Sequence, residues 1–84
     1  MSNLELIDVS APDVSGVRFT ARHDGQAHTV FLTSEALEDV EYQHYDSSAD
    51  LLAAFERQRA LIATHVAQAL ASGASGEVRI GSLH

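Results

Sequence analysis

Residues 47–73 read SSADLLAAFERQRALIATHVAQALASG, and this stretch decides the fold. At about 100° per residue, its large apolar side chains fall on one stripe of a helix, whereas Arg57, Thr64 and Gln68 fall on the opposite side. Alanine, leucine, glutamine and arginine lose little conformational freedom in a helix. The stretch therefore predicts one long amphipathic helix, with a small sheet folded against it.

Both ends of this predicted helix carry boundary signals. Ser47, with Asp50 three residues later, approximates a capping box that satisfies free backbone N–H groups. Gly73 can adopt the left-handed conformation that ends a helix. A helix of this length spans about 37 Å, which is more than a small sheet can cover. Part of the apolar stripe is therefore expected to be available to a second copy of the chain.

Arg59 is the charged residue that falls within the apolar stripe, close to Phe55 and Val66. In one interpretation its stem packs on the core while the guanidinium reaches the rim or pairs with a carboxylate. In the other, the planar guanidinium binds an anion or a partner. Arg59 is therefore a candidate partner-binding residue.

Residues 17–33 predict a β-hairpin around Asp24-Gly25, a dipeptide that favours a two-residue type I′ turn. Such a turn pairs His23 with Gln26, and the remaining register follows by counting. One face is then largely apolar, with Val17 opposite Leu32, Phe19 opposite Val30 and Ala21 opposite His28. A slip of one residue would destroy this agreement between the two strands.

The second face of the hairpin places Arg18 opposite Phe31, Thr20 opposite Thr29 and Arg22 opposite Ala27. This face can be a solvated sheet surface on which Arg18 stacks over Phe31. It can also be a contact surface for an acidic partner, including a second copy of the chain. Arg18, Arg22 and Phe31 are therefore candidate partner-binding residues.

The remaining segments complete an α+β fold in a single domain, residues 1–84. Leu4–Val9 is a weak strand candidate, residues 10–16 contain the only proline and predict a turn, and residues 76–83 alternate as a final strand. Residues 33–43, TSEALEDVEYQ, predict one to two turns of helix capped by Thr33 or Ser34. We expect a three- to four-stranded, mainly antiparallel sheet with the long helix on one face.

The composition narrows the classes of function. Twelve acidic residues against five arginines give a net charge of −7, which opposes general binding to nucleic acid or anionic membranes. Without cysteine, disulfides, thiolate nucleophiles and cysteine-based zinc sites are excluded. No apolar run approaches the ~18 residues of a membrane span, and the N-terminus does not resemble a signal peptide. A soluble cytoplasmic protein is expected.

No group of residues predicts catalysis or a metal site. The loop with His44, Tyr45 and Asp46 most resembles a fragment of an active site, but spacing alone establishes no geometry. His23 and His28 lack the third ligand that zinc requires. The acidic residues of the short helix predict a solvated face: Glu35, Glu38, Asp39 and Glu41. We therefore expect no catalytic residue, no metal and no cofactor.

Several motifs together carry a resemblance to a known family: VRFTA (17–21), the Asp24-Gly25 turn, LTSEAL (32–37), AFERQRALIATHVAQAL (54–70) and GEVRI (76–80). In this order they resemble a family of small bacterial proteins catalogued as a domain of unknown function, number fourteen-eighty-eight in that series. The resemblance implies a small α+β fold with an antiparallel sheet and one long helix. It implies no activity and no catalytic residues.

These observations favour a small bacterial cytoplasmic protein that acts as a non-catalytic interaction or regulatory module. A homodimer is expected, together with a protein partner whose identity the sequence does not indicate. An alternative is a nucleic-acid-binding accessory protein that uses Arg18, Arg22 and Phe31. Salt dependence of binding separates the two functions, because phosphate contacts weaken steeply with ionic strength. An enzyme built around His44 and Tyr45 would require a concave pocket with a perturbed titrating group.

Overall fold

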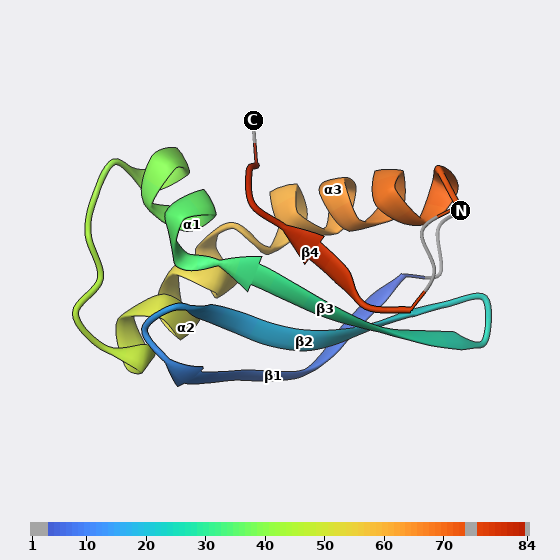
Figure 1. Ribbon diagram of the computed structural model, residues 1–84, viewed down its shortest axis with the longest axis horizontal. Coiled ribbons are helices and arrows are strands. Elements are labelled where there is room, and N and C mark those ends of the chain that lie inside the picture. The colour runs from blue at the N-terminus through green and yellow to red at the C-terminus, as the bar shows by residue number, and fades with distance from the viewer. Residues whose placement is uncertain (1–3, 74–75, 84) are drawn as a thin grey trace.

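The computed structural model describes residues 4–73 and 76–83, which form four strands and three helices (Figure 1). In chain order these are β1 (Glu5–Asp13), β2 (Gly16–His23), β3 (Gln26–Thr33), α1 (Ser34–Glu41), α2 (Ser48–Arg57), α3 (Arg59–Ala71) and β4 (Val78–Ile80). The sheet order is β1-β2-β3-β4, in which the first three strands are antiparallel and β4 runs parallel to β3. The predicted α+β class is confirmed, with a mixed sheet.

The β2–β3 hairpin has the predicted register. His23 pairs with Gln26, and Phe19 lies opposite Val30. The turn residues Asp24 and Gly25 have φ angles of 50° and 81°, the positive values that a type I′ turn requires at both central positions. The local sequence therefore sets both the turn and the two faces of the ribbon.

The hydrophobic core lies between one face of the sheet and the three helices (Figure 1). It includes alternate residues of the hairpin, namely Val17, Phe19, Ala21, Val30 and Leu32. From the helices, Leu51, Phe55 and Ile62 are fully buried, and the rings of Phe19 and Phe55 lie 5.1 Å apart between centroids. The other face of the sheet carries the exposed or half-buried residues of the same alternation, and no described helix packs on it.

The long helix predicted from Ser47 to Gly73 is divided into two helices that meet at Gln58. The backbone of Gln58 has φ −103° and ψ 15°, outside the helical region. Helix-like hydrogen bonds still cross the junction, since Gln58 N–H donates to Ala54 O and Ile62 N–H donates to Gln58 O. As a result α2 lies against β1 and β2, whereas α3 reaches β4. None of the helices within residues 4–73 and 76–83 is both long and apolar enough to cross a bilayer.

The helix ends follow the predicted signals. The Thr33 hydroxyl accepts a hydrogen bond from Ala36 N–H, and the Ser47 hydroxyl accepts one from Asp50 N–H, both at 3.2 Å. These bonds satisfy backbone donors that have no partner within the first turn of a helix. Gly73 has φ 91°, in agreement with its predicted role after the last helix.

The first strand differs from the prediction because it continues to Asp13, through part of the segment expected to form a turn. Its pairing with β2 is irregular, with register shifts between Ile7 and Ser10 and between Ser10 and Asp13. Asp8 has a positive φ of 55° within this segment. Pro12 is tolerated because β1 is an edge strand, where a missing N–H donor costs no ladder hydrogen bond.

Candidate partner interface

Three residues form a row across the open face of the sheet. In the observed register Arg18 of β2 lies opposite Phe31 of β3, which in turn lies opposite Arg79 of β4. The guanidinium carbon of Arg79 lies 5.7 Å from the centroid of the Phe31 ring. The predicted stacking of Arg18 on Phe31 is therefore replaced by stacking of Arg79, because the parallel strand β4 places that residue beside the ring.

Three of the five arginines pair with carboxylates: Arg22 with Glu5 at 2.9 Å, Arg57 with Glu41 at 2.7 Å and Arg59 with Glu56 at 2.8 Å. Arg18 and Arg79 form no ion pair with any residue in the described ranges 4–73 and 76–83. Both are exposed. The two arginines that lack a carboxylate therefore flank the same phenylalanine.

Arg22 and Arg59 have different surroundings. Arg22 lies on the open face with Arg18, but its guanidinium donates to Glu5 on β1. The pairing raises the pKa of Arg22 above its ordinary value, chiefly through the hydrogen bond to Glu5. Arg59 lies on the helical side of the sheet, so the structure does not bring all four candidate residues together.

Arg59 stacks on the core and holds a carboxylate at the same time. Its guanidinium carbon lies 5.2 Å from the centroid of the buried Phe55 ring. Nε and Nη2 donate to Glu56 at 2.9 and 2.8 Å, and Nη1 donates to the backbone oxygen of Leu6 at 3.1 Å. With 41% of the side chain exposed, this geometry agrees with the interpretation of a stem on the core and a paired head at the rim.

A groove lies between α3 and the beginning of β1. It consists of two adjoining hollows of about 700 and 500 Å³, which share Leu4 and Ala63. The first hollow is lined further by apolar residues and by four charged ones, Glu5, Glu56, Arg57 and Arg59. The second is lined by small residues of α3, including Thr64, and by Gln68. We call it the α3 groove. The second hollow is lined by uncharged residues alone, and α3 carries no Asp, Glu, Lys or Arg after Arg59.

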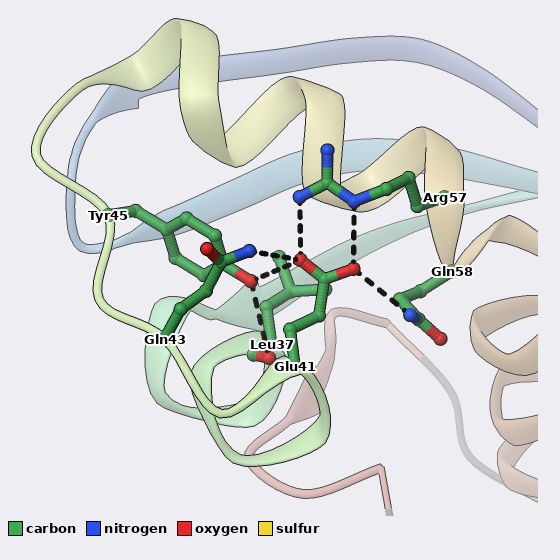
Figure 2. Close-up of polar contacts among 6 residues, drawn as sticks. All are labelled: Leu37, Glu41, Gln43, Tyr45, Arg57 and Gln58. Atoms are coloured by element: carbon green, nitrogen blue, oxygen red, sulfur yellow. Dashed lines mark hydrogen bonds and ion pairs between the residues drawn. The ribbon is translucent and has the colours of Figure 1, made fainter.

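The most extensive polar cluster surrounds Glu41, at the end of α1 (Figure 2). Its carboxylate is only 7% exposed and accepts five hydrogen bonds. Arg57 donates through Nε and Nη2 at 3.0 and 2.7 Å, and the Tyr45 hydroxyl donates at 2.6 Å. The side-chain amides of Gln43 and Gln58 donate at 3.1 and 3.0 Å. The prediction that Glu41 lies on a solvated helix face is therefore wrong.

The titration behaviour of this cluster argues against acid–base chemistry near neutral pH. The hydrogen bonds from Arg57 hold the pKa of Glu41 well below its ordinary value of 4.5. Burial, together with the hydrogen bond to Glu41, raises the pKa of Tyr45 to about 12. General acids and bases work best with a pKa near the working pH. Both shifts move the pKa away from neutral pH, and the hydrogen bonds of the cluster join the end of α1 to Tyr45, Arg57 and Gln58.

In the loop that most resembled an active site, His44 and Asp46 lie at the surface, whereas Tyr45 is buried. The ring of His44 is 77% exposed and contacts Glu38 through Nδ1 at 2.7 Å and Asp46 through Nε2 at 3.3 Å. Tyr45 points instead toward Glu41 (Figure 2), and Tyr42 is 89% exposed. Within residues 4–73 and 76–83, no group of three or more potential metal ligands lies together.

Two comparisons identify relatives of the chain. The family described as "Protein of unknown function (DUF1488)" matches residues 9–80. The chain belongs to the DUF1488 family. A crystal structure of a DUF1488 protein of unknown function from Shewanella loihica PV-4 has a similar fold, with a TM-score of 0.79 and 18% sequence identity. The match covers 94% of this chain and 92% of that chain. No curated protein matches the sequence.

The family match confirms the resemblance carried by the sequence motifs, and neither DUF1488 match names a catalytic activity. Two residues of interest were not among the predicted site residues. Arg79 was assigned only to the final strand, and its position beside Phe31 depends on parallel pairing that alternation does not reveal. Glu41 was assigned to a solvated face, although an acidic residue at the end of α1 opposes the helix dipole and could have indicated a cationic partner.

Proposed function

We propose that this DUF1488 protein is a cytoplasmic, non-catalytic interaction module that self-associates through the α3 groove. The observation that carries the proposal is the absence of charge along α3, where residues 60–71 read ALIATHVAQALA on a protein of net charge −7. Only Ile62 and Val66 of this helix are buried. Leu61, Ala63, Ala69 and Leu70 pack partly against the core. The exposed positions of residues 60–71 are Ala60, Thr64, Gln68 and Ala71, and none of them carries a charge that would have to be desolvated in an interface.

Small exposed side chains and the lack of charge support a second copy of the chain as the partner of this surface. Ala60, Thr64 and Ala71 are exposed and lie one turn or two turns apart along α3. Small side chains at such positions let two helices pack closely, at the lower end of the usual distance of about 8–10 Å between helix axes. In a two-fold dimer the same patch serves both subunits, so each α3 would lie in or beside the groove of the other copy. The second hollow of the groove, which is uncharged, also avoids the repulsion expected between two acidic chains.

The non-catalytic part of the proposal is supported by the Glu41 cluster. The pKa of Glu41 is lowered and that of Tyr45 is raised to about 12, so both move away from neutral pH, whereas a general acid or base works best with a pKa near the working pH. The shallow polar hollow beside it, about 290 Å³, is lined by Tyr45 and the exposed His44. It adds no nucleophile with an adjacent base, such as a serine held by a histidine.

Self-association is tested by light scattering coupled to size-exclusion chromatography at micromolar concentration. The wild-type chain should elute with twice the monomer mass of 9.0 kDa. Thr64→Glu places a charge in the groove and should give a monomer, because an unpaired charge in an interface is costly. Thr29→Glu introduces the same side chain at an exposed position of the open sheet face and should leave the dimer intact. A wild-type monomer at every concentration would remove the proposal.

Nucleic-acid binding through Arg18, Arg22 and Phe31 is the second candidate function. The observation in its favour is that Arg18 and Arg79, on the open face, have no carboxylate partner among residues 4–73 and 76–83. Against it stand the pairing of Arg22 with Glu5 and the net charge of −7. Binding of an oligonucleotide that weakens steeply between low and moderate salt would support this function.

A further inference from the structure

We infer that the open face of the sheet carries a docking site for an acidic segment of another protein, centred on Arg18, Phe31 and Arg79. We call these three residues the arginine row. They lie in one cross-strand row over β2, β3 and β4. Adjacent strands are separated by about 4.8 Å, so the two arginines start about 10 Å apart with the phenylalanine between them. The site lies on the face of the sheet opposite the helices and is separate from the α3 groove.

The charge pattern indicates an anionic ligand. Acidic residues outnumber arginines by twelve to five, so most surface arginines are expected to form an ion pair with a carboxylate of the same chain. Arg22, Arg57 and Arg59 each hold one, whereas both arginines of the row hold none within the described ranges. Two unpaired guanidinium groups on a common face attract carboxylates through charge-assisted hydrogen bonds, which are often bidentate.

The phenylalanine indicates that the ligand also has an apolar part. Phe31 is half-buried, and its ring lies beside Gly16, where a Cβ atom would approach Phe31 Cζ to 2.6 Å. Arg79 stacks over the ring from β4. The row therefore offers two cationic ends and an aromatic centre, with the hydroxyls of Thr20 and Thr29 in the neighbouring row. An acidic peptide with an apolar side chain between its carboxylates satisfies all of these groups.

The negative net charge of the protein favours an acidic protein segment over nucleic acid as the ligand. A polyanionic strand would extend beyond the arginine row over a protein of net charge −7, where most surface charges are acidic. One of the arginines on this face, Arg22, is already neutralised by Glu5. A short acidic peptide needs only the two free guanidinium groups and leaves the acidic surroundings uncovered.

The test uses the full chain and a fluorescently labelled peptide of alternating glutamate and tyrosine, with fluorescence anisotropy as the measurement. A peptide in which glutamine replaces every glutamate is the matched ligand control, and single-stranded oligothymidine is the nucleic-acid probe. The acidic peptide should bind, and the glutamine peptide should not. The variant Arg18→Gln/Arg79→Gln should bind the acidic peptide roughly tenfold to thirtyfold more weakly, if each exposed charge pair contributes up to about 1 kcal/mol.

Arg22→Gln is the matched protein control, because it removes the same charge from the same face at a residue that is already paired. It should change the peptide affinity by less than about twofold. Arg18→Gln alone removes no hydrogen bond, ion pair or cation–π contact within residues 4–73 and 76–83, so a loss of peptide affinity of about fivefold in this variant reports on binding and not on folding. Equal losses in all three variants, no binding of the acidic peptide, or binding of oligothymidine in its place would overturn the inference.

Discussion

Glu41 and Arg57 form a two-point ion pair that fastens the end of α1 to the end of α2. Nε of Arg57 lies 3.0 Å from one carboxylate oxygen, and Nη2 lies 2.7 Å from the other. The carboxylate is nearly buried, whereas half of the arginine side chain is exposed. Gln58, at the junction of α2 and α3, donates to the same carboxylate. One side chain therefore holds three helices in their relative positions.

Replacing the carboxylate by an amide should destabilise the fold. In Glu41→Gln an NH₂ group would face donors that now point at an oxygen, so at least one hydrogen bond becomes a contact between two donors. We expect the free energy of unfolding to fall by about 1–3 kcal/mol. Urea denaturation followed by circular dichroism measures the loss. Glu77→Gln, at an exposed position, is the control and should unfold like the wild type. Equal stability of both variants would contradict the role of the Glu41 cluster.

The lowered pKa of the Glu41 carboxylate predicts that the folded state loses stability at acidic pH. The folded-state pKa of Glu41 lies below its ordinary value of 4.5, so its stabilising contribution is complete above that value and is lost as the pH falls below it. Urea midpoints measured at pH 7 and at about pH 3.5 should differ more for the wild type than for Glu41→Gln. Identical pH dependence in the two proteins would show that other groups cause the acid sensitivity.

The raised pKa of Tyr45 predicts that the folded state loses stability at alkaline pH. Its folded-state pKa is raised to about 12, so its contribution to stability is present below the ordinary value of 10 and is lost above it. An alkaline absorbance titration should show a phenolate signal near pH 12 that disappears in Tyr45→Phe. Tyr42→Phe, at an exposed position, should retain that late signal. The loss of one hydrogen bond should also lower the stability of Tyr45→Phe by about 1 kcal/mol.

Gly16 should tolerate no side chain. An added Cβ would lie 2.6 Å from Phe31 Cζ and closer still to the backbone oxygen of Leu32, which cannot move away without breaking the sheet. We expect Gly16→Ala to reduce the free energy of unfolding by about 1–3 kcal/mol. Gly81→Ala is the matched control, because nothing lies within 4 Å of the added atom. Similar denaturation midpoints for the two variants would mean that the ring of Phe31 does not rest where the structure places it.

The parts of the fold that depend on local chemistry follow from the sequence. The Asp24-Gly25 turn and the alternation on either side of it determine the hairpin register, because a slip of one residue would bury the wrong face. Thr33 and Ser47 identify the starts of two helices. This too is local chemistry, because each side chain accepts a hydrogen bond from the backbone N–H only three residues later.

The parts that depend on distant contacts do not follow from the sequence. The division of the long helix coincides with Gln58, whose side chain is held by Glu41 seventeen residues earlier in the chain. Periodicity continues through this point and gives no signal of the break. The arginine row is likewise incomplete in the sequence, because Arg79 joins Phe31 only through a parallel strand pair, and alternation does not specify strand order.

The parallel pairing of β4 with β3 has a consequence for the order in which the protein folds. Residues 78–80 are synthesised after all three helices, so the outer edge of β3 has no strand partner while α1, α2 and α3 emerge from the ribosome. An unpaired strand edge is a template for association with other chains. Pairing with β4, whose Val78 and Ile80 are buried, covers this edge from Val30 to Leu32. Strand β4 therefore covers part of an edge that would otherwise be open to association with other chains.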